Sequence, residues 1–205
     1  MLRRTLLLAL VGVRALKLRV ASRRAFAFGA VAAPAAVTIS PAVAAELREA
    51  TFSGGDPRFL QPFFDEIKYK GVQRVSVGSM DDGTRAINVA YNPAKCSYKF
   101  LLGTFLRNVD PTRETDPWSA SGSEPSSYRS VIWVQSEEER ELALKAMRLL
   151  QESGIYGKDK PFLTEVLDAR PFVPEPENQD FYINSEKSYE KLLKKTGRAA
   201  FFEKT

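Results

Sequence analysis

The 205-residue sequence has no histidine and a single cysteine, Cys96. These absences exclude zinc sites built on histidine, Ser-His-Asp and Cys-His catalytic groups, and a histidine general base. They also exclude an intramolecular disulfide, so stability must come from the core. The acidic pair in Asp81-Asp82-Gly83 has too few neighbouring oxygen ligands for a calcium loop and is better explained by a turn. We therefore expect no metal ion and no cofactor.

Acidic residues are absent from the first 45 positions, which contain seven of the 30 basic residues. From Glu46 onward, 23 basic residues face 25 acidic ones, so this part has a formal charge of −2. The sequence pI of 9.3 therefore reflects the N-terminal segment and not the domain that follows. This charge distribution gives no support to nucleic-acid binding.

Residues 1–45 read as a bipartite targeting leader. A short apolar run, residues 6–13, follows Arg3-Arg4 and is too short to span a bilayer. A second block begins with Ser22-Arg23-Arg24-Ala25-Phe26 and continues uncharged to Ala45, which resembles a twin-arginine export signal. Two signals in tandem favour delivery to the thylakoid lumen of a plastid. The alternatives are one ordinary signal for a secreted or periplasmic protein, or an uncleaved anchor.

Residues 46–205 are expected to form one domain in which strands and helices alternate. Apolar periodicity predicts strands at 47–53, 72–77, 86–91, 128–134 and 164–169, and helices at 59–68, 97–108, 136–153 and 185–196. The clearest helix has Ser136 as its N-cap, Glu139 three residues later and Gly154 at its end. The order predicts an α+β two-layer sandwich with a mixed β-sheet and a ferredoxin-like β-α-β-β-α-β core. Residues 110–127 form a long, polar, proline-containing loop that is expected to be functional or disordered.

A set of short motifs lies along the chain in a fixed order. They are Ala50-Thr51-Phe52-Ser53-Gly54-Gly55, Val89-Ala90-Tyr91-Asn92-Pro93 with Ser97-Tyr98, Phe105-Leu106-Arg107-Asn108-Val109-Asp110-Pro111-Thr112, Tyr128-Arg129-Ser130, Thr164-Glu165-Val166 with Pro171-Phe172, and Asn178-Gln179-Asp180-Phe181-Tyr182. Together they cover about residues 47–198 and resemble the A-class peptide methionine sulfoxide reductases. The resemblance implies the fold of that family. It also implies a chemistry in which a cysteine thiolate attacks the sulfoxide sulfur, an acid protonates the oxygen, and resolving cysteines reduce the sulfenic acid.

The functional positions of that family are mostly replaced in this chain. Asp56 stands where the resemblance places the nucleophilic cysteine, and Arg85 stands where it places the catalytic glutamate. A carboxylate is a poor nucleophile toward sulfur, and an arginine does not release a proton at neutral pH. The other pocket positions that the resemblance identifies are Pro57 and Arg58 for the aromatic pair, Ser79 for a tyrosine, Ser123 for an aspartate, Asn178 for a histidine, and Tyr128, which is retained.

Asp56-Pro57 also has a structural explanation, because aspartate is a strong N-cap and proline is favoured at the first helical position. Pro62 would disturb a helix started at Pro57, so the regular helix is expected to begin near Gln61. Asp56 is expected to pair with Arg58 or with Arg85, which would neutralise the pocket. Cys96 is interpreted as a small core residue.

Three functions remain open. The first is a pseudoenzyme that serves as a structural or interaction module in the lumen, with a protein partner such as a thylakoid membrane complex and with membrane contact only through that partner. The second is an active peptide methionine sulfoxide reductase with an atypical site. The third is recognition of sulfoxide or methionine peptides without reduction, with Phe59, Trp118 and Tyr128 as apolar walls.

Overall fold

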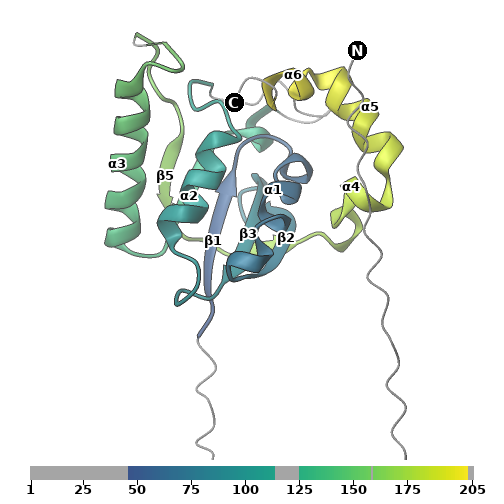
Figure 1. The fold of residues 1–205 in the computed structure, drawn as a ribbon, viewed down its shortest axis with the longest axis horizontal. Coiled ribbons are helices and arrows are strands. Elements are labelled where there is room, and N and C mark those ends of the chain that lie inside the picture. The colour runs from purple at the N-terminus through teal and green to yellow at the C-terminus, as the bar shows by residue number, and fades with distance from the viewer. Residues whose placement is uncertain (1–45, 114–124, 158, 203–205) are drawn as a thin grey trace, which may run out of the picture. The chain divides into compact units, whose positions relative to one another are not determined.

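A computed structural model describes residues 46–113, 125–157 and 159–202 (Figure 1). Six strands form one mixed sheet in the order β5-β4-β1-β3-β2-β6, in which only the β4–β5 pair is parallel. The predicted leader, residues 1–45, lies outside the described residues. The strands are β1 (Arg48–Ser53), β2 (Val72–Met80), β3 (Arg85–Tyr91), β4 (Val131–Val134), β5 (Glu165–Asp168) and β6 (Phe172–Pro174).

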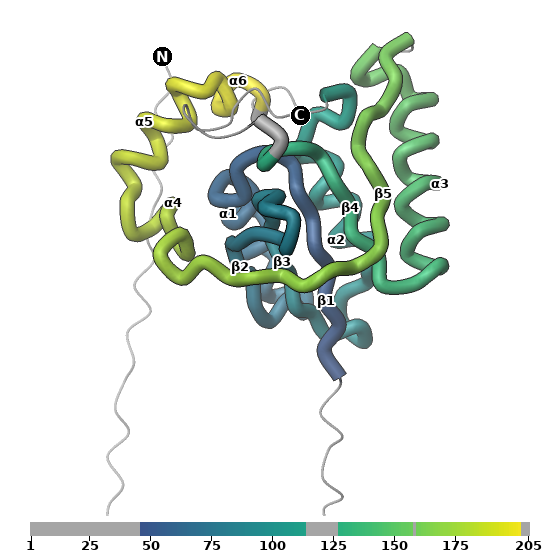
Figure 2. The backbone as a smooth tube through the Cα atoms, turned by 180° about the vertical axis from the view of Figure 1, so that it is seen from behind, coloured from purple at the N-terminus to yellow at the C-terminus, as the bar shows by residue number. Residues whose placement is uncertain are grey.

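The predicted ferredoxin-like core is confirmed. The chain runs β1-α1-β2-β3-α2-β4, and these four strands lie in the spatial order β4-β1-β3-β2. After β5, the chain crosses from one edge of the sheet to the other to form β6 beside β2 (Figure 2). The helices are α1 (Gln61–Asp65), α2 (Tyr98–Arg107), α3 (Glu137–Ser153), α4 (Phe181–Asn184), α5 (Glu186–Thr196) and α6 (Arg198–Phe202).

The main apolar core lies between one face of the sheet and the helices α1, α2 and α3. Phe52 of β1 is fully buried at its centre, and its ring stacks on Phe64 of α1 at 5.8 Å and on Phe105 of α2 at 4.9 Å. A smaller cluster around Trp133 occupies the opposite face. Successive residues of β4 belong alternately to the two clusters, because successive side chains of a strand point to opposite faces of the sheet.

Local capping signals set the ends of the longest helix as predicted. The Ser136 side chain accepts a hydrogen bond from the Glu139 amide at 3.3 Å, and the Glu139 carboxylate accepts one from the Gln135 amide at 2.9 Å. Gly154 ends the helix in the left-handed conformation, with φ of 71°, where glycine pays no steric penalty.

The predicted helix at 59–68 is wrong in its extent. A 3-10 turn covers Pro57–Phe59, α1 covers only Gln61–Asp65, and a second turn covers Lys68–Lys70 before Gly71 at φ of 110°. Pro62 accounts for the interruption, because it lacks the amide donor and occupies the first turn of a helix that starts at Gln61. The expected start near Gln61 is confirmed.

Other boundaries differ where tertiary contacts decide them. β2 extends to Met80, where its end pairs with β3 on one side and with β6, which the sequence pattern did not predict, on the other. The short helices α4 and α6 were also not predicted. The predicted strand at 128–134 is regular only from Val131, after a 3-10 turn at Pro125–Tyr128. None of the described helices combines the length and the apolar character that a bilayer span requires.

Candidate functional site

The site lies where β1 ends and the chain turns into the first 3-10 helix. Gly54 is required by close packing, since a Cβ there would lie 2.2 Å from Cγ1 of Val109. Gly55 adopts φ of 87°, a conformation that favours glycine. The two glycines therefore turn the chain tightly beneath α2 and place Asp56 inside the fold, where it is 1% exposed.

Asp56 caps the 3-10 helix and binds Arg58. Its Oδ1 accepts hydrogen bonds from the Arg58 amide at 3.1 Å and from Arg58 Nε at 3.0 Å. Its Oδ2 accepts from Arg58 Nη2 at 2.5 Å. Of the two expected partners the structure selects Arg58, and Pro57 occupies the first helical position as predicted. Both carboxylate oxygens are thus engaged.

The Arg58 guanidinium is held on several sides. Its pKa is raised above the usual value, chiefly because Asp56 accepts its hydrogen bonds, with burial acting in the opposite direction. Electrostatic interactions with Glu175 and Tyr128 add smaller increases to the pKa, so these residues lie near Arg58. The guanidinium carbon also lies 4.7 Å from the centre of the Phe181 ring, a cation–π contact.

Arg85 forms a second ion pair rather than binding Asp56. Its Nη1 donates to Glu175 Oε1 at 2.5 Å, and Asn178 Nδ2 donates to the other carboxylate oxygen of Glu175 at 2.7 Å. Ser79 pairs with Arg85 across the β2–β3 ladder. Arg85 Nε is buried and has no hydrogen-bond partner among the described residues. Glu175, which the sequence analysis did not identify, is therefore the residue that joins Arg85 to Asn178.

The segment after β6 is anchored to the ferredoxin-like core by side-chain amides. Gln179 Nε2 donates to the Val77 carbonyl at 2.5 Å, and its Oε1 accepts from the Val77 amide at 3.0 Å. Gln61 Nε2 donates to Asp180 Oδ1 at 2.8 Å, and its Oε1 accepts from the Asp180 amide at 3.0 Å. These bonds bring the Asn178-Gln179-Asp180 tripeptide beside the start of α1.

Aromatic residues and Arg198 from the C-terminal helices cover the 3-10 helix. The ring of Tyr189 on α5 lies 5.7 Å from that of Phe59, which is fully buried. Burial raises the pKa of Tyr189 to about 12, with a smaller increase from Asp56. Arg198 of α6 is buried over Phe59 and donates to the carbonyls of Gly54 and Asn108 at 3.4 and 2.9 Å.

The remaining expected positions divide into two groups. Tyr128 is 6% exposed and lies near Arg58, so it belongs to the site. Ser123 and Trp118 fall outside the described residues. Cys96 is a core residue as interpreted: it is 3% exposed, it belongs to the main apolar cluster, and burial raises its pKa, which keeps the thiol protonated.

The arrangement is a charge-balanced, mostly buried cluster. Two carboxylates and two guanidinium groups form the pairs Asp56–Arg58 and Arg85–Glu175. The only thiol of the chain is the core residue Cys96, so none of these positions offers a sulfur nucleophile. The described residues contain no group of three or more His, Cys, Asp or Glu side chains that could hold a metal ion. These hydrogen bonds and ion pairs hold the segment after β1 and the segment after β6 in place.

Comparison with known proteins identifies the family that this chain resembles. The family model described as "Peptide methionine sulfoxide reductase" matches residues 64–205, a range that begins after Asp56. A peptide methionine sulfoxide reductase MsrA of Listeria monocytogenes is 34% identical over 172 residues, covering 77% of this chain and 94% of the relative. The MsrA of Bacillus pumilus is 37% identical over 119 residues, covering 58% of this chain and 64% of that relative, just under two thirds of its length.

Solved structures agree on the fold. Methionine sulfoxide reductase A of Corynebacterium diphtheriae superposes with a TM-score of 0.54 at 20% identity, covering 68% of this chain and 76% of the other. The reduced form of Mxr1 from Saccharomyces cerevisiae also gives a TM-score of 0.54, at 16% identity, with coverage of 70% and 88%. At these identities the likeness concerns the fold alone.

Proposed function

The chain belongs to the peptide methionine sulfoxide reductase family, and we propose that it is a pseudoenzyme of that family, retained as a structural or interaction module. One observation carries the proposal. The position that the family resemblance gives to the nucleophilic cysteine is Asp56, and both of its carboxylate oxygens are bound by the neighbouring Arg58. An engaged, 1% exposed carboxylate is not available to attack a substrate sulfur.

The residues present also do not support the other step of the family chemistry, in which an acid protonates the sulfoxide oxygen. The position of the acid is Arg85, and a guanidinium group is too weak an acid to supply a proton to the substrate. Its partner Glu175 carries a carboxylate, but that group accepts hydrogen bonds from Arg85 and Asn178. A cation and its counter-ion thus replace a proton donor.

The location and the partner are further parts of the proposal. The tandem signals of residues 1–45 support delivery to the thylakoid lumen, where the module would dock on a photosynthetic membrane complex and reach the membrane only through it. A test is whether the protein co-purifies with thylakoid membranes after a salt wash. Recovery only as a free lumenal monomer would contradict docking, and recovery outside the plastid would favour the secreted or periplasmic alternative.

A turnover assay tests the loss of catalysis. The purified chain is incubated with a peptide containing methionine sulfoxide and with dithiothreitol, beside a Cys96→Ser variant. We expect no difference between the two proteins and no turnover above background. Turnover by the unaltered chain that Cys96→Ser abolishes would establish an atypical reductase. Binding of the sulfoxide peptide by calorimetry without turnover would instead indicate recognition without reduction.

A further inference from the structure

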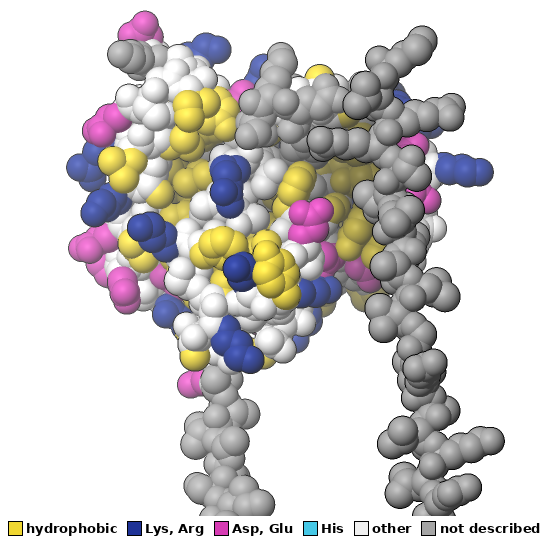
Figure 3. All heavy atoms as spheres, in the orientation of Figure 1, with side chains coloured by type: hydrophobic (Ala, Val, Ile, Leu, Met, Phe, Trp, Pro, Cys, Tyr) yellow, Lys and Arg dark blue, Asp and Glu magenta, His cyan; other side chains and the backbone are white. Residues whose placement is uncertain are grey.

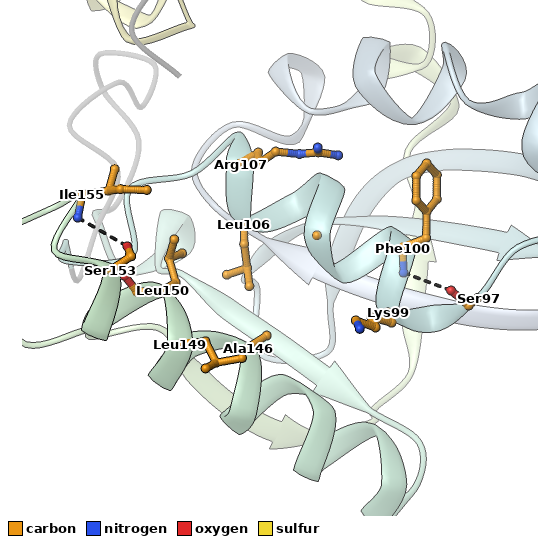
Figure 4. A pocket seen from close by; sticks show the side chains of 11 residues that line it. Ser97, Lys99, Phe100, Leu106, Arg107, Ala146, Leu149, Leu150, Ser153 and Ile155 are labelled. Atoms are coloured by element: carbon orange, nitrogen blue, oxygen red, sulfur yellow. Dashed lines mark hydrogen bonds between the residues drawn. The ribbon is translucent and has the colours of Figure 1, made fainter.

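A groove of about 630 Å³ lies between α2 and α3, on the side of the domain that the helices cover (Figure 4). Most of its lining is apolar, and three of these side chains are well exposed: Phe100 at 36%, Leu149 at 57% and Ile155 at 72%. Figure 3 shows apolar side chains gathered over these two helices. The groove shares no lining residue with the site around Asp56. A contiguous exposed apolar surface of this kind is typical of a binding surface.

The charged side chains that line the groove have one sign. Lys99 and Arg107 are the only charged side chains in its lining, and both extend from α2 (Figure 4). No ion pair in the described part of the chain neutralises either of them. They are eight residues apart on one helix, which corresponds to about 12 Å along its axis. The groove is therefore complementary to an apolar surface that carries acidic groups about two helical turns apart.

Gly103 lies between these two cations and leaves the surface of α2 bare. Glycine is unfavourable within a helix, and a Cβ at this position would meet no atom within 4 Å. The packing of the domain therefore does not require glycine here. Ala146 on α3 is another small residue in the lining. Small side chains on α2 and α3 would let another helix pack against them with a short distance between the helix axes.

We propose that this α2–α3 groove binds an amphipathic α-helix of a partner protein. The apolar face of that helix packs against Phe100, Gly103 and Leu149, and acidic residues about two turns apart pair with Lys99 and Arg107. The inference names the partner chemistry for the interaction role proposed above and in that sense rests on it. The groove itself would bind in the same way if the domain proved to be catalytic.

Two other occupants fit less well. In a symmetric pair of chains the same patch faces itself, so Lys99 and Arg107 would meet the cations of the second copy. An anionic lipid surface would satisfy the two cations, but it is flat and would leave a groove between two helices unfilled. A helix matches both the concave shape and the charge.

The experiment uses the full chain and a labelled synthetic helix of about four turns. This peptide has leucine and alanine along one face and two glutamates two turns apart on the flank, and a control peptide has lysines in their place. Fluorescence anisotropy is expected to show that the glutamate peptide binds roughly tenfold or more tightly than the lysine peptide. The double variant Lys99→Glu/Arg107→Glu is expected to reverse this preference.

Gly103→Leu is the matched variant for the apolar part of the groove. Leucine favours the helix and enters open space, so the melting temperature is expected to stay the same or rise. Binding of the glutamate peptide is expected to weaken roughly tenfold or more, because the side chain occupies the place of the ligand. A folded Gly103→Leu protein that binds as well as the unaltered chain would overturn the proposal.

Further results would overturn it in distinguishable ways. Absence of glutamate-peptide binding, or equal binding of both peptides, would contradict the helix and its charges. Binding to phosphatidylglycerol vesicles in place of the peptide would assign the surface to lipid. Self-association that Gly103→Leu abolishes would assign it to a second copy. Turnover of a sulfoxide peptide would overturn only the loss of catalysis, and failure of helix binding would overturn only the groove.

Discussion

Arg58→Met is the most informative perturbation of the site around Asp56. The substitution keeps the length of the side chain and removes the guanidinium that binds Asp56. The Asp56 side chain is 1% exposed, so its carboxylate would remain buried with one hydrogen bond, from the amide of residue 58. Leaving a charge buried without its partner is strongly destabilising. The expected effect is a large loss in the free energy of unfolding.

The magnitude follows from burial and from the contacts that are lost. Breaking a buried ion pair by removing one partner costs about 3–5 kcal/mol. Because the Arg58 side chain is 18% exposed, water reaches part of the site, and we expect about 3 kcal/mol, toward the lower end of that range. This figure includes the cation–π contact with Phe181, which contributes about 1 kcal/mol. Asp56→Asn keeps the cap and the volume and is expected to cost about 1–2 kcal/mol.

The assay is equilibrium unfolding in urea, followed by the fluorescence of buried Trp133, for the two single variants and the double variant. In the double variant neither charge remains, so its loss should be smaller than the sum of the two single losses by about 1 kcal/mol or more. Arg74→Met is the matched control, because the Arg74–Glu49 pair is exposed and should matter by less than about 1 kcal/mol. Additive losses, or an Arg58→Met protein as stable as the control, would refute the reasoning.

Three further predictions concern turnover, packing at two glycines and the titration of Tyr189. Asp56→Cys is expected to give no turnover of a methionine sulfoxide peptide with dithiothreitol, because Arg85 cannot protonate the oxygen; turnover would show that only the nucleophile was missing. Gly54→Ala is expected to cost about 1–3 kcal/mol in urea unfolding through overpacking, whereas Gly103→Ala should stabilise by up to about 1 kcal/mol. The pKa of Tyr189 is raised from 10.0 to about 12, so the folded state holds this proton more tightly than the unfolded chain. That contribution is present below pH 10 and is lost as the pH rises from about 10 to about 12, and Tyr189→Phe should lose less stability across this window.

Features that depend on near neighbours were predictable from the sequence. The capping role of Asp56 needs only the next two residues, and the start of α1 at Gln61 follows from Pro62. The Ser136 cap and the Gly154 stop of α3 are likewise local signals. Each of these depends on backbone geometry within one helical turn, so a short window of sequence contains the necessary information.

The pairing within the site was predictable only in part. The sequence suggested that Asp56 would bind one of two arginines, but it contained no signal that Glu175 would take Arg85. Glu175 lies 90 residues further along the chain and reaches Arg85 only because β6 pairs with the far edge of β2. Gln61 and Asp180 are 119 residues apart, and their paired bonds arise from the same docking of the C-terminal segment. A strand of three residues has too short a pattern to be recognised in advance.

The sequence alone therefore determined the ferredoxin-like order of elements and the capping role of Asp56, because periodicity and capping act between residues close in the chain. The tertiary structure decided which cation neutralises which carboxylate, how completely the C-terminal helices cover Phe59, and that a bare, basic groove remains between α2 and α3. Those outcomes depend on distances between segments that only the packed fold brings together.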